Sequence, residues 1–548
     1  MARSLPAPFV SPDRQRLHEA RGEWPLPNLT AILEERARAT PDRVIFVTDA
    51  ERVTAADLRA RADRLAAGLE NLGLGPGDVV SWQLPNWLEG VLLSFAIDRI
   101  GAIANPIIPI YREREVSFIA RQAGSRALVV PGVVRGFDHR ELARTVQQEA
   151  TELEHVLVAR AEPGNGQRSL ESLLDTRAPA SPLAPSPIGP YDVSALFYTS
   201  GTTSEPKGVM HTPSTLGSFM RVGLTVSGAT ESDVGILWFP LAHIGGIVTI
   251  GIQSVLRGSR AVFLEQFDPE RGLELIEREG VTSAGGPTPI LQALLGARGF
   301  RPERVRTVRI AGLGATEVPP ELMREVGRNL DALVYRSYGM TECPMATAGR
   351  REDPEERRVM TDGKASPGVV VRITDDAGKP VAPNVEGEVE LFGPQLCVGY
   401  VDPARTAEAF TADGFLRSGD LAVMDEEGYV RITGRKKDII IRKGENLSAK
   451  AIEDELYDHP KVADVAVIGV RDRASGERVC ACVVLRANAG GLTLDELRSF
   501  MIGRQVMAQK IPEQLEIVAE LPRNATGKVK KFELRAHFAQ RDPGSATK

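Results

Sequence analysis

The stretch YTSGTTSEPKGVMHT, residues 198–212, combines hydroxyl side chains, glycines and one lysine. Glycines let the backbone approach an anion closely, hydroxyl and N–H groups donate to its oxygens, and the ammonium of Lys207 supplies positive charge. This composition predicts a phosphate-binding loop. It is also the composition of a flexible polar surface loop, so it does not decide between the two. A Walker A loop is excluded, because the pattern GxxxxGK[ST] is absent here and no Ser or Thr follows Lys207.

Three further side chains carry charges that could act on a phosphate or a metal ion. Glu342 follows YGMT, residues 338–341, shortly after the apolar run ALVY, residues 332–335, and Asp420 lies shortly before the turn-like stretch DEEG, residues 425–428. Lys528 ends the small-residue stretch NATGK, residues 524–528. A carboxylate can hold Mg²⁺ or accept hydrogen bonds from two hydroxyls, and a lysine can neutralise developing negative charge. Each has an ordinary alternative: a solvated glutamate, a turn aspartate, and one of several neighbouring lysines.

The composition limits the class of protein. With 548 residues, the chain exceeds what one hydrophobic core usually serves, so we expect at least two domains. Hydrophobic and charged residues make up 42% and 26% of the chain, as is ordinary for a soluble globular protein. The formal net charge of -6 argues against nucleic acid as the main partner, because phosphate backbones attract basic surfaces.

The cysteines and the hydrophobic runs indicate the compartment. Four cysteines in so long a chain, with no CxxC pair, favour a reducing environment. The N-terminus has no continuous apolar segment of the signal-peptide kind, and no run of 18 apolar residues occurs elsewhere. We therefore expect a cytoplasmic protein without a transmembrane segment.

One segment shows the organisation of the first half clearly. Val79–Leu84 is predicted to be a strand, Asn86 an N-cap, and residues 87–100 a helix that ends at Gly101. A second strand begins at Ile103. This β-α-β pattern predicts a mainly parallel sheet.

The hydroxyl-rich stretch has its own local prediction. Residues 177–190 are rich in Pro, Ala and Ser and indicate an exposed connector before a strand at Ser194–Tyr198. Thr212 followed by Pro213 is typical of an N-cap and the first position of a helix. The stretch is therefore predicted to be a strand-loop-helix connection.

The last part of the chain predicts a smaller unit. Short strands at 438–442, 464–470 and 480–487 alternate with helices, and the charged stretch GRKKD, residues 434–438, marks the boundary. We predict an α/β fold in which residues 1–436 form a large N-terminal domain of mainly parallel β-sheets flanked by helices. Residues 437–548 are expected to form a smaller, mobile α+β C-terminal domain.

The order of residues in 198–209 resembles the signature YTSGTTGxPKGV of the adenylate-forming superfamily. This superfamily includes acyl-CoA and aryl-CoA synthetases, luciferases and the adenylation domains of nonribosomal peptide synthetases. Ser204 stands where the family usually has glycine. Five more stretches resemble the family's motifs, in the family's order: FPLAHIGG (239–246), YGMTE (338–342), RSGDLA (417–422), GRKKDIIIRKGENL (434–447) and PRNATGKVKK (522–531). The chain is identified as a member on these six motifs together.

The resemblance implies a reaction in two steps. A carboxylate attacks the α-phosphorus of ATP to give acyl-AMP and pyrophosphate, and a thiol then displaces AMP. ATP, Mg²⁺ and CoA are the implied cofactors. Lys528, Glu342 and His243 are the implied catalytic residues, with Glu342 as the metal ligand. The implied contacts to ATP or AMP come from Thr199, Ser200, Gly201, Thr202, Thr203, Lys207, Gly314, Ala315, Tyr338, Gly339, Thr341, Asp420 and Arg435.

The remaining implied roles concern domain motion and the other substrates. The small domain swings about Lys437 between the two steps, and Lys443 and Gly444 meet CoA. The acyl pocket is implied at His243, Gly285, Gly286 and Gly312.

Two features narrow the substrates. FPLAHIGGIVTIG, residues 239–251, contains no acidic side chain, and a buried substrate ammonium without a partner would be costly. This favours an acid with an apolar body and no amino group. Residues 83–119 resemble medium-chain and cyclohexanecarboxylate–CoA ligases, which favours a medium-chain fatty or alicyclic acid. Nothing resembling a carrier domain follows residue 548, so free CoA is the expected acceptor.

Other functions stay open at this point. One is an acyl-AMP ligase that loads a separate carrier protein, and another is a non-catalytic relative that binds nucleotide or acyl-AMP. A P-loop NTPase would release ADP, whereas the present interpretation predicts AMP and pyrophosphate. The oligomeric state is open, with a homodimer as one alternative.

Overall fold

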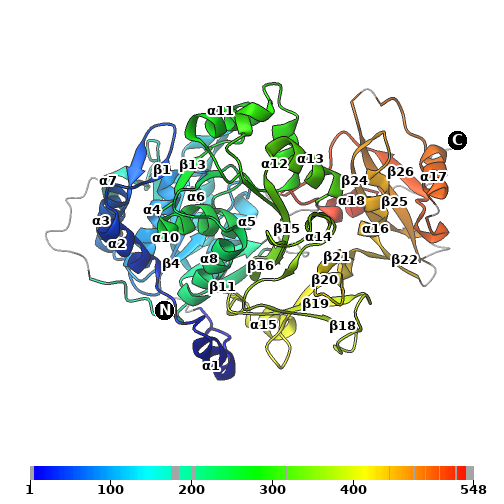
Figure 1. Cartoon of the computed structure of the whole chain (residues 1–548). Helices are drawn as coiled ribbons and strands as arrows, with labels where there is room; N and C mark the ends of the chain where they lie inside the picture. Colours follow the sequence, from blue (N-terminus) through cyan, green and yellow to red (C-terminus); the bar gives the residue numbers. More distant parts are fainter. Residues whose placement is uncertain are drawn as a thin grey trace.

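The computed structural model describes residues 5–174, 184–199, 205–314, 318–442, 445–472, 476–487, 489–504, 506–524 and 527–538. The chain forms a large N-terminal domain rich in parallel β-sheet and a separate, smaller C-terminal domain at one end of it (Figure 1). The predicted α/β fold class is confirmed.

The largest sheet has seven strands in the order β11-β10-β4-β3-β5-β8-β9. All neighbours are parallel except β10 and β11. The strands are β3 (Val79–Trp82), β4 (Ile103–Pro106), β5 (Ser125–Pro131), β8 (His155–Ala159), β9 (Arg168–Ser169), β10 (Ala195–Thr199) and β11 (Lys207–His211). The nearby helices and the small hairpin are α4 (Leu88–Arg99), α5 (Glu113–Ala123), α6 (His139–Glu149), α7 (Glu171–Leu174), β6 (Val133–Val134) and β7 (Phe137–Asp138).

The predicted β-α-β unit is confirmed, with one correction. Gly101 follows helix α4 with φ of 77°, as a glycine after a helix end commonly does. The N-cap is Trp87, not Asn86. The Asn86 side chain instead donates to the Leu264 carbonyl and accepts from the Leu241 N–H, so it ties α4 to other elements.

The hydroxyl-rich stretch differs from its prediction. A second strand, β11, pairs antiparallel with β10 before the helix begins, so the connection is strand-loop-strand-helix. The physical reason is that β11 covers the backbone groups that β10 would otherwise expose at a sheet edge. Val209 and Met210 are both buried there. Thr212 caps helix α8 (Pro213–Ser227), with Pro213 in its first turn, as predicted.

Two four-stranded sheets complete the core of the N-terminal domain, in the orders β12-β13-β1-β2 and β14-β15-β16-β17. Ser283 links them by bridging to Gly235 and Ile310. Their strands are β1 (Val44–Val47), β2 (Arg52–Thr54), β12 (Val234–Leu237), β13 (Arg260–Phe263), β14 (Ile310–Leu313), β15 (Leu333–Met340), β16 (Cys343–Ala348) and β17 (Lys364–Ala365). The other helices of the N-terminal domain include α1 (Pro12–Ala20), α2 (Leu29–Ala39), α3 (Ala55–Asn71), α9 (Ile244–Gly246), η1 (Ile247–Ile252), α10 (Gln253–Arg257), α11 (Pro269–Glu279), α12 (Thr288–Leu295), η2 (Pro302–Val305), α13 (Pro320–Leu330) and α14 (Glu355–Met360).

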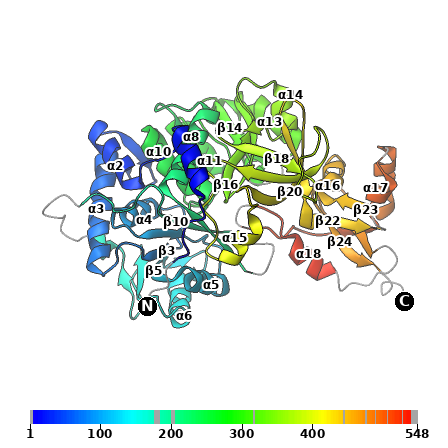
Figure 2. The ribbon, with the colours of Figure 1, turned by 90° about the horizontal axis from the view of Figure 1, so that it is seen from below.

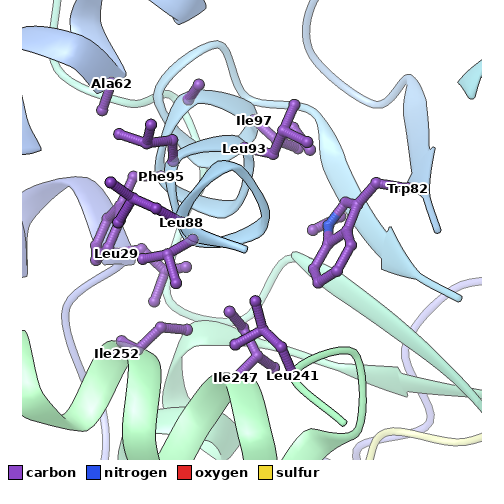
Figure 3. Packing of buried hydrophobic residues seen from close by; sticks show 14 of the residues in the cluster. Leu29, Ala62, Trp82, Leu88, Leu93, Phe95, Ile97, Leu241, Ile247 and Ile252 are labelled. Carbon is purple, nitrogen blue, oxygen red and sulfur yellow. The ribbon is translucent and has the colours of Figure 1, made fainter. Parts of the chain in front are cut away.

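The main hydrophobic core lies where α4 meets its neighbours. Figure 3 shows Leu93 of α4 on the side of Trp82 of β3, and Leu88 and Phe95 on the other side of α4 near Leu29 of α2. The packing fixes α9, η1 and α10 as one continuous helical wall against the first sheet's helices. This wall also lines one side of the cavity that holds the candidate site.

A smaller antiparallel sheet, β18-β19-β20-β21, joins the two domains. It consists of β18 (Val370–Thr374), β19 (Gly387–Phe392), β20 (Leu416–Met424) and β21 (Val430–Arg435), with α15 (Pro403–Ala409) beside it. The C-terminal domain has the sheet β23-β22-β25-β24 with β26 beside β25. Its elements are η3 (Lys436–Asp438), β22 (Ile439–Arg442), β23 (Glu445–Ser448), α16 (Ala449–Tyr457), β24 (Val462–Asp472), β25 (Gly476–Leu485), α17 (Leu494–Gly503), η4 (Ala508–Lys510), β26 (Gln514–Ile517) and α18 (Lys531–Phe538).

The predicted boundary after residue 436 lies within η3, between the last strand of the joining sheet and the first strand of the C-terminal sheet. Within the described ranges, no helix combines the length and the apolar character that crossing a membrane requires.

Gly363 offers a test of how β16 and β17 are held together. It has φ of 80°, and an added Cβ would lie 1.9 Å from the carbonyl carbon of Ala348. Gly363→Ala is expected to destabilise the domain by roughly 2–4 kcal/mol, because left-handed strain and overpacking add. The measurement is the midpoint of thermal or urea unfolding.

The matched control is Gly378→Ala. Gly378 has φ of 75° but no atom within 4 Å of an added Cβ, so only the conformational cost of roughly 1–2 kcal/mol is expected. Equal shifts in the two variants would contradict the role assigned to the close approach of Gly363 to β16.

Candidate active site

A cavity of about 2100 Å³ lies between the two domains. Figures 1 and 2 show α16 and α18 on the side of the C-terminal domain that faces the N-terminal domain. The cavity contains every predicted site residue that the structure describes: Thr199, Lys207, His243, Gly285, Gly286, Gly312, Gly314, Tyr338, Gly339, Thr341, Glu342, Asp420, Arg435, Lys437 and Lys528. The predicted residues Ser200, Gly201, Thr202, Thr203, Ala315, Lys443 and Gly444 lie outside the described residues.

Asp420 is the centre of a polar cluster on the floor of the cavity. It stands opposite Arg435 on the neighbouring strand, and the Arg435 Nε lies 2.9 Å from Asp420 Oδ1. The Tyr338 hydroxyl donates to Asp420 Oδ2 at 2.8 Å. The charge of Asp420 raises the pKa of Arg435, and burial together with that charge raises the pKa of Tyr338. The cluster offers a carboxylate and a guanidinium side by side.

Glu342 lies in the turn between β15 and β16, at the strand end that the sequence indicated. The Tyr400 hydroxyl donates to Glu342 Oε1 at 2.7 Å, and the Glu342 carbonyl accepts from the Cys397 N–H at 2.7 Å. His211 Nε2 lies 2.9 Å from the neighbouring Thr341 carbonyl. The carboxylate is therefore oriented by a side chain, and its turn is held by backbone contacts.

Tyr400 was not predicted as a site residue. It lies in the apolar run LCVGY, residues 396–400, which carries no recognisable signal of chemistry. Burial and the Glu342 charge raise its pKa, so its hydroxyl stays protonated and can keep donating. The Lys207 Nζ lies 5.9 Å from the centre of the Tyr400 ring, which places the lysine of the hydroxyl-rich stretch beside this pair.

The single carboxylate of Glu342 fits a magnesium ion whose other ligands are substrate oxygens and water. The described residues contain no group of three or more His, Cys, Asp or Glu side chains able to hold a metal. Mg²⁺ commonly binds one or two carboxylates and completes its shell with phosphate oxygens and water. Glu342 could serve as such a ligand. One of its oxygens accepts a hydrogen bond from Tyr400, and the other is left for the ion.

Lys528 reaches this site from the C-terminal domain. Its N–H donates to the Asn524 side chain at 2.8 Å, and its carbonyl accepts from the Asn524 N–H at 2.8 Å. Burial, and then the positive charge of Arg435, lower the pKa of Lys528 to about 8, while Asp420 and Glu342 act in the opposite direction. These influences place the ammonium within electrostatic reach of N-terminal groups more than 90 residues away in the sequence.

His243 marks the other side of the cavity. Its Nδ1 accepts from the Gly245 N–H at 3.1 Å, so the neutral ring carries its proton on Nε2. Burial and the charge of Lys528 lower the pKa of His243 to about 4. The ring is therefore neutral near pH 7 and offers one N–H donor.

The glycines predicted for the acyl pocket serve close packing as well. An added Cβ at Gly285 would lie 2.3 Å from the Gly312 carbonyl oxygen, and one at Gly312 would lie 2.8 Å from the Tyr335 ring. The same holds for Gly339, where a Cβ would lie 2.4 Å from the Met345 nitrogen. Glycine is required at these positions by backbone and side-chain neighbours, whatever the cavity binds.

Lys437 lies in η3, at the junction of the two domains. Burial, followed by the charge of Arg435, lowers its pKa to about 8. Its neighbour Asp438 pairs with Arg535 of α18 at 2.7 Å. Lys437 lines the cavity, and its predicted role as a hinge stays a prediction.

Comparison with known proteins identifies the class. The chain matches the family described as AMP-binding enzyme over residues 33–401, and the AMP-binding enzyme C-terminal domain over residues 451–528. It therefore belongs to the AMP-binding enzyme family, as the six motifs predicted.

The relatives include acid ligases. Medium-chain fatty-acid–CoA ligase of Escherichia coli (strain K12) is 33% identical over 96% of this chain and 93% of its own length. Salicyl-AMP ligase / salicyl-S-ArCP synthetase of Mycobacterium tuberculosis (strain ATCC 25618 / H37Rv) is 32% identical over 96% of this chain and 93% of its own length. The chain is an adenylate-forming acid ligase.

Solved structures of one neighbour superpose over most of the chain. ATP-bound MatB from Rhodopseudomonas palustris superposes with a TM-score of 0.85 at 30% identity, covering 94% of this chain and 99% of MatB. Apo MatB superposes with a TM-score of 0.73 at 30% identity, covering 93% and 99%. The overall superposition is closer on the ATP-bound structure of MatB than on the apo structure.

The Tyr400–Glu342 contact gives a prediction. Tyr400→Phe removes the donor to the carboxylate, so Glu342 is no longer fixed in one orientation. Groups that orient a metal ligand typically contribute roughly 10- to 100-fold to metal affinity or activity. We expect the Mg²⁺ concentration that half-saturates ATP-dependent thermal stabilisation to rise about tenfold.

Tyr191→Phe is the matched control, because the Tyr191 hydroxyl also donates to a carboxylate, that of Glu19, but lies outside the cavity. It should leave the Mg²⁺ dependence unchanged. The same Mg²⁺ dependence in Tyr400→Phe and in the unchanged protein would contradict the assignment of Glu342 as the metal ligand.

Proposed function

We propose that this chain is an ATP-dependent acid–CoA ligase that activates a medium-chain fatty or alicyclic acid as acyl-AMP and then transfers the acyl group to CoA. The observation that carries the proposal is the convergence of Lys528, from the C-terminal domain, on the N-terminal residues Glu342, Asp420 and Arg435.

The first step brings together two anions, a carboxylate and ATP. Negative charge accumulates where they meet, and positioned cations stabilise it. Lys528 is proposed to neutralise the reacting carboxylate and α-phosphate, and Lys207 the leaving pyrophosphate. Asp420 accepts hydrogen bonds from the ribose hydroxyls, and Tyr338 packs on the adenine. Mg²⁺ bound at Glu342 would supply further positive charge to the phosphates.

The acid is expected to lie beside His243. The neutral ring can donate from Nε2 to an oxygen of the substrate carboxylate. The wall formed by α9, η1 and α10, residues 244–257, contains no acidic side chain that could pair with a substrate amine. The similarity to medium-chain fatty-acid–CoA ligase supports an acid with an aliphatic body.

The second step needs a thiol. Lys443 and Gly444 are proposed to contact CoA after the C-terminal domain has turned about Lys437. The alternative acceptor is a carrier protein, favoured by the similarity to salicyl-S-ArCP synthetase. In both cases the acyl carbon bonds to sulfur and AMP leaves.

The experiment measures AMP and pyrophosphate release from ATP, Mg²⁺ and a panel of acids, with and without CoA. The panel contains acetate, octanoate, palmitate, cyclohexanecarboxylate, benzoate and several amino acids. CoA-dependent AMP release with octanoate or cyclohexanecarboxylate is expected. A single turnover that CoA does not extend would favour the carrier-protein alternative, and ADP release would contradict the mechanism.

Lys528 provides the sharpest single substitution. Lys528→Ala removes the charge at the reacting phosphate, so acid-dependent exchange between ATP and pyrophosphate should fall roughly 10²–10³-fold. Lys530→Ala is the matched control, because the Lys530 ammonium bonds to Glu533 at 2.8 Å. It should stay within about twofold of the unchanged protein, and equal losses in both variants would refute the assignment.

The lowered pKa of Lys528 predicts a pH dependence. Because the ammonium is the useful form, its fraction in the free enzyme falls as the pH rises through about 8. The kcat/KM of the exchange reaction, which reports on the free enzyme, should decline over that range. In Lys528→Arg the residual activity should lose this decline, since a guanidinium stays protonated. An unchanged decline in that variant would assign it to another group.

A further inference from the structure

The cavity extends beyond His243, away from Lys528 and Glu342. It continues between α8 and the wall formed by α9, η1 and α10. The part next to His243 is apolar, with Phe219 and Ile250, and the far part is polar. The far part is lined by Ser227, Asp233, Gln253, Ser254, Arg257 and Ser259.

Arg257 carries a charge that the described residues do not pair. Its Nη2 lies 3.4 Å from Gln253 Oε1, which is a weak contact, and its Nε is buried without a hydrogen-bond partner. Among the described residues, no carboxylate oxygen lies within 4 Å of its guanidinium. Burial lowers its pKa, and the charge of Asp233 acts in the opposite direction.

Asp233 is the nearby carboxylate, but it is occupied by other groups. Arg309 binds both of its oxygens, with Nε 2.9 Å from Oδ1. The Thr282 hydroxyl donates to Oδ1 at 2.6 Å, and the Thr230 N–H donates to Oδ2 at 2.6 Å. Asp233 is therefore neutralised by Arg309, and Arg257 remains available to another anion.

Gln253 lies beside Arg257 and is itself held in place by α8. Its Nε2 donates to the Met220 carbonyl at 2.7 Å, which leaves Oε1 for the guanidinium. A Cβ at Gly223 of α8 would lie 2.7 Å from Gln253 Nε2. The Gln253 amide can therefore pack at this point only because residue 223 is glycine. The far end is thus built from both walls of the cavity.

The separation of the two ends sets the length of a ligand that could span them. From Ile244 to Arg257 the wall rises roughly 20 Å at ~1.5 Å per residue. An extended chain covers about 1.2 Å per bond, a third of the length of a residue. At about 1.2 Å per bond, roughly 20 Å corresponds to about 17 bonds, so an acid with an aliphatic chain of roughly 16 or more carbons could reach from one end to the other.

We propose that the far end binds a second anionic group, so that the preferred substrate is an α,ω-dicarboxylic acid whose distal carboxylate pairs with Arg257. This inference rests on the proposed acid ligase function and replaces the medium-chain or alicyclic acid named there with a longer acid that carries a second carboxylate. One carboxylate bonds to the α-phosphorus as the bond from that phosphorus to the pyrophosphate oxygen breaks. The distal carboxylate keeps its charge and takes no part in the reaction.

The experiment compares kcat/KM for AMP release across matched acids. Octanoate, dodecanoate and hexadecanoate are run beside the dicarboxylic acids and the ω-hydroxy acids of the same lengths. The dicarboxylic acid of the best length is expected to exceed its monocarboxylic counterpart by roughly tenfold or more, as a paired and partly buried charge typically contributes.

Arg257→Met separates specificity from activity. It should lower kcat/KM for the dicarboxylic acid about tenfold while the monocarboxylic acid keeps or gains activity, which also shows that the variant folds. Arg257→Lys should restore part of the preference. Arg221→Met is the control, because Arg221 is an exposed arginine of α8 outside the cavity.

The outcomes distinguish the two proposals. Activity on monocarboxylic acids with no dicarboxylate preference, or an equal preference for ω-hydroxy acids, would overturn the anion site and leave the ligase function standing. Absence of AMP release with every acid would refute the ligase function itself.

Discussion

The site depends on holding cations close together where water is partly excluded. Lys528 and Lys437 both lie near Arg435, and burial and this like charge disfavour their protonated forms. Only the carboxylates of Asp420 and Glu342 act in the opposite direction at Lys528. An anionic substrate relieves the repulsion, so the arrangement favours bound ATP.

In the N-terminal domain the charged groups Asp420, Arg435 and Glu342 are positioned by strands and a short strand turn. Asp420 and Arg435 are cross-strand neighbours, so the sheet sets their separation. Glu342 lies in a tight strand turn that Cys397 and Tyr400 hold from outside. The N-terminal helix α1 supports this arrangement, because buried Arg14 donates to the Cys397 carbonyl at 3.1 Å. A residue near the start of the chain therefore stabilises the turn around Glu342.

Sequence patterns predicted much of the fold and most of the described site. The β-α-β unit at residues 79–106 and the helix cap at Thr212 follow from local rules of periodicity and capping. The strand β11 was missed, because its five residues have no clear alternation and its role is to cover an edge that only the assembled sheet exposes. Asn86 was misassigned for a similar reason: its side chain bonds to distant backbone groups instead of the nearby helix end.

The sequence by itself determined the family, because the order and chemistry of six motifs are carried by residue identity alone. It also determined which side chains can supply charge to a phosphate. Only the tertiary structure decided that Tyr400 orients Glu342 and that Lys528 of the C-terminal domain lines the same cavity as Arg435. It alone placed the Arg257 guanidinium at the far end of the cavity. Such contacts join residues far apart in the chain, and their energies depend on burial and distance, which no local pattern of residues encodes.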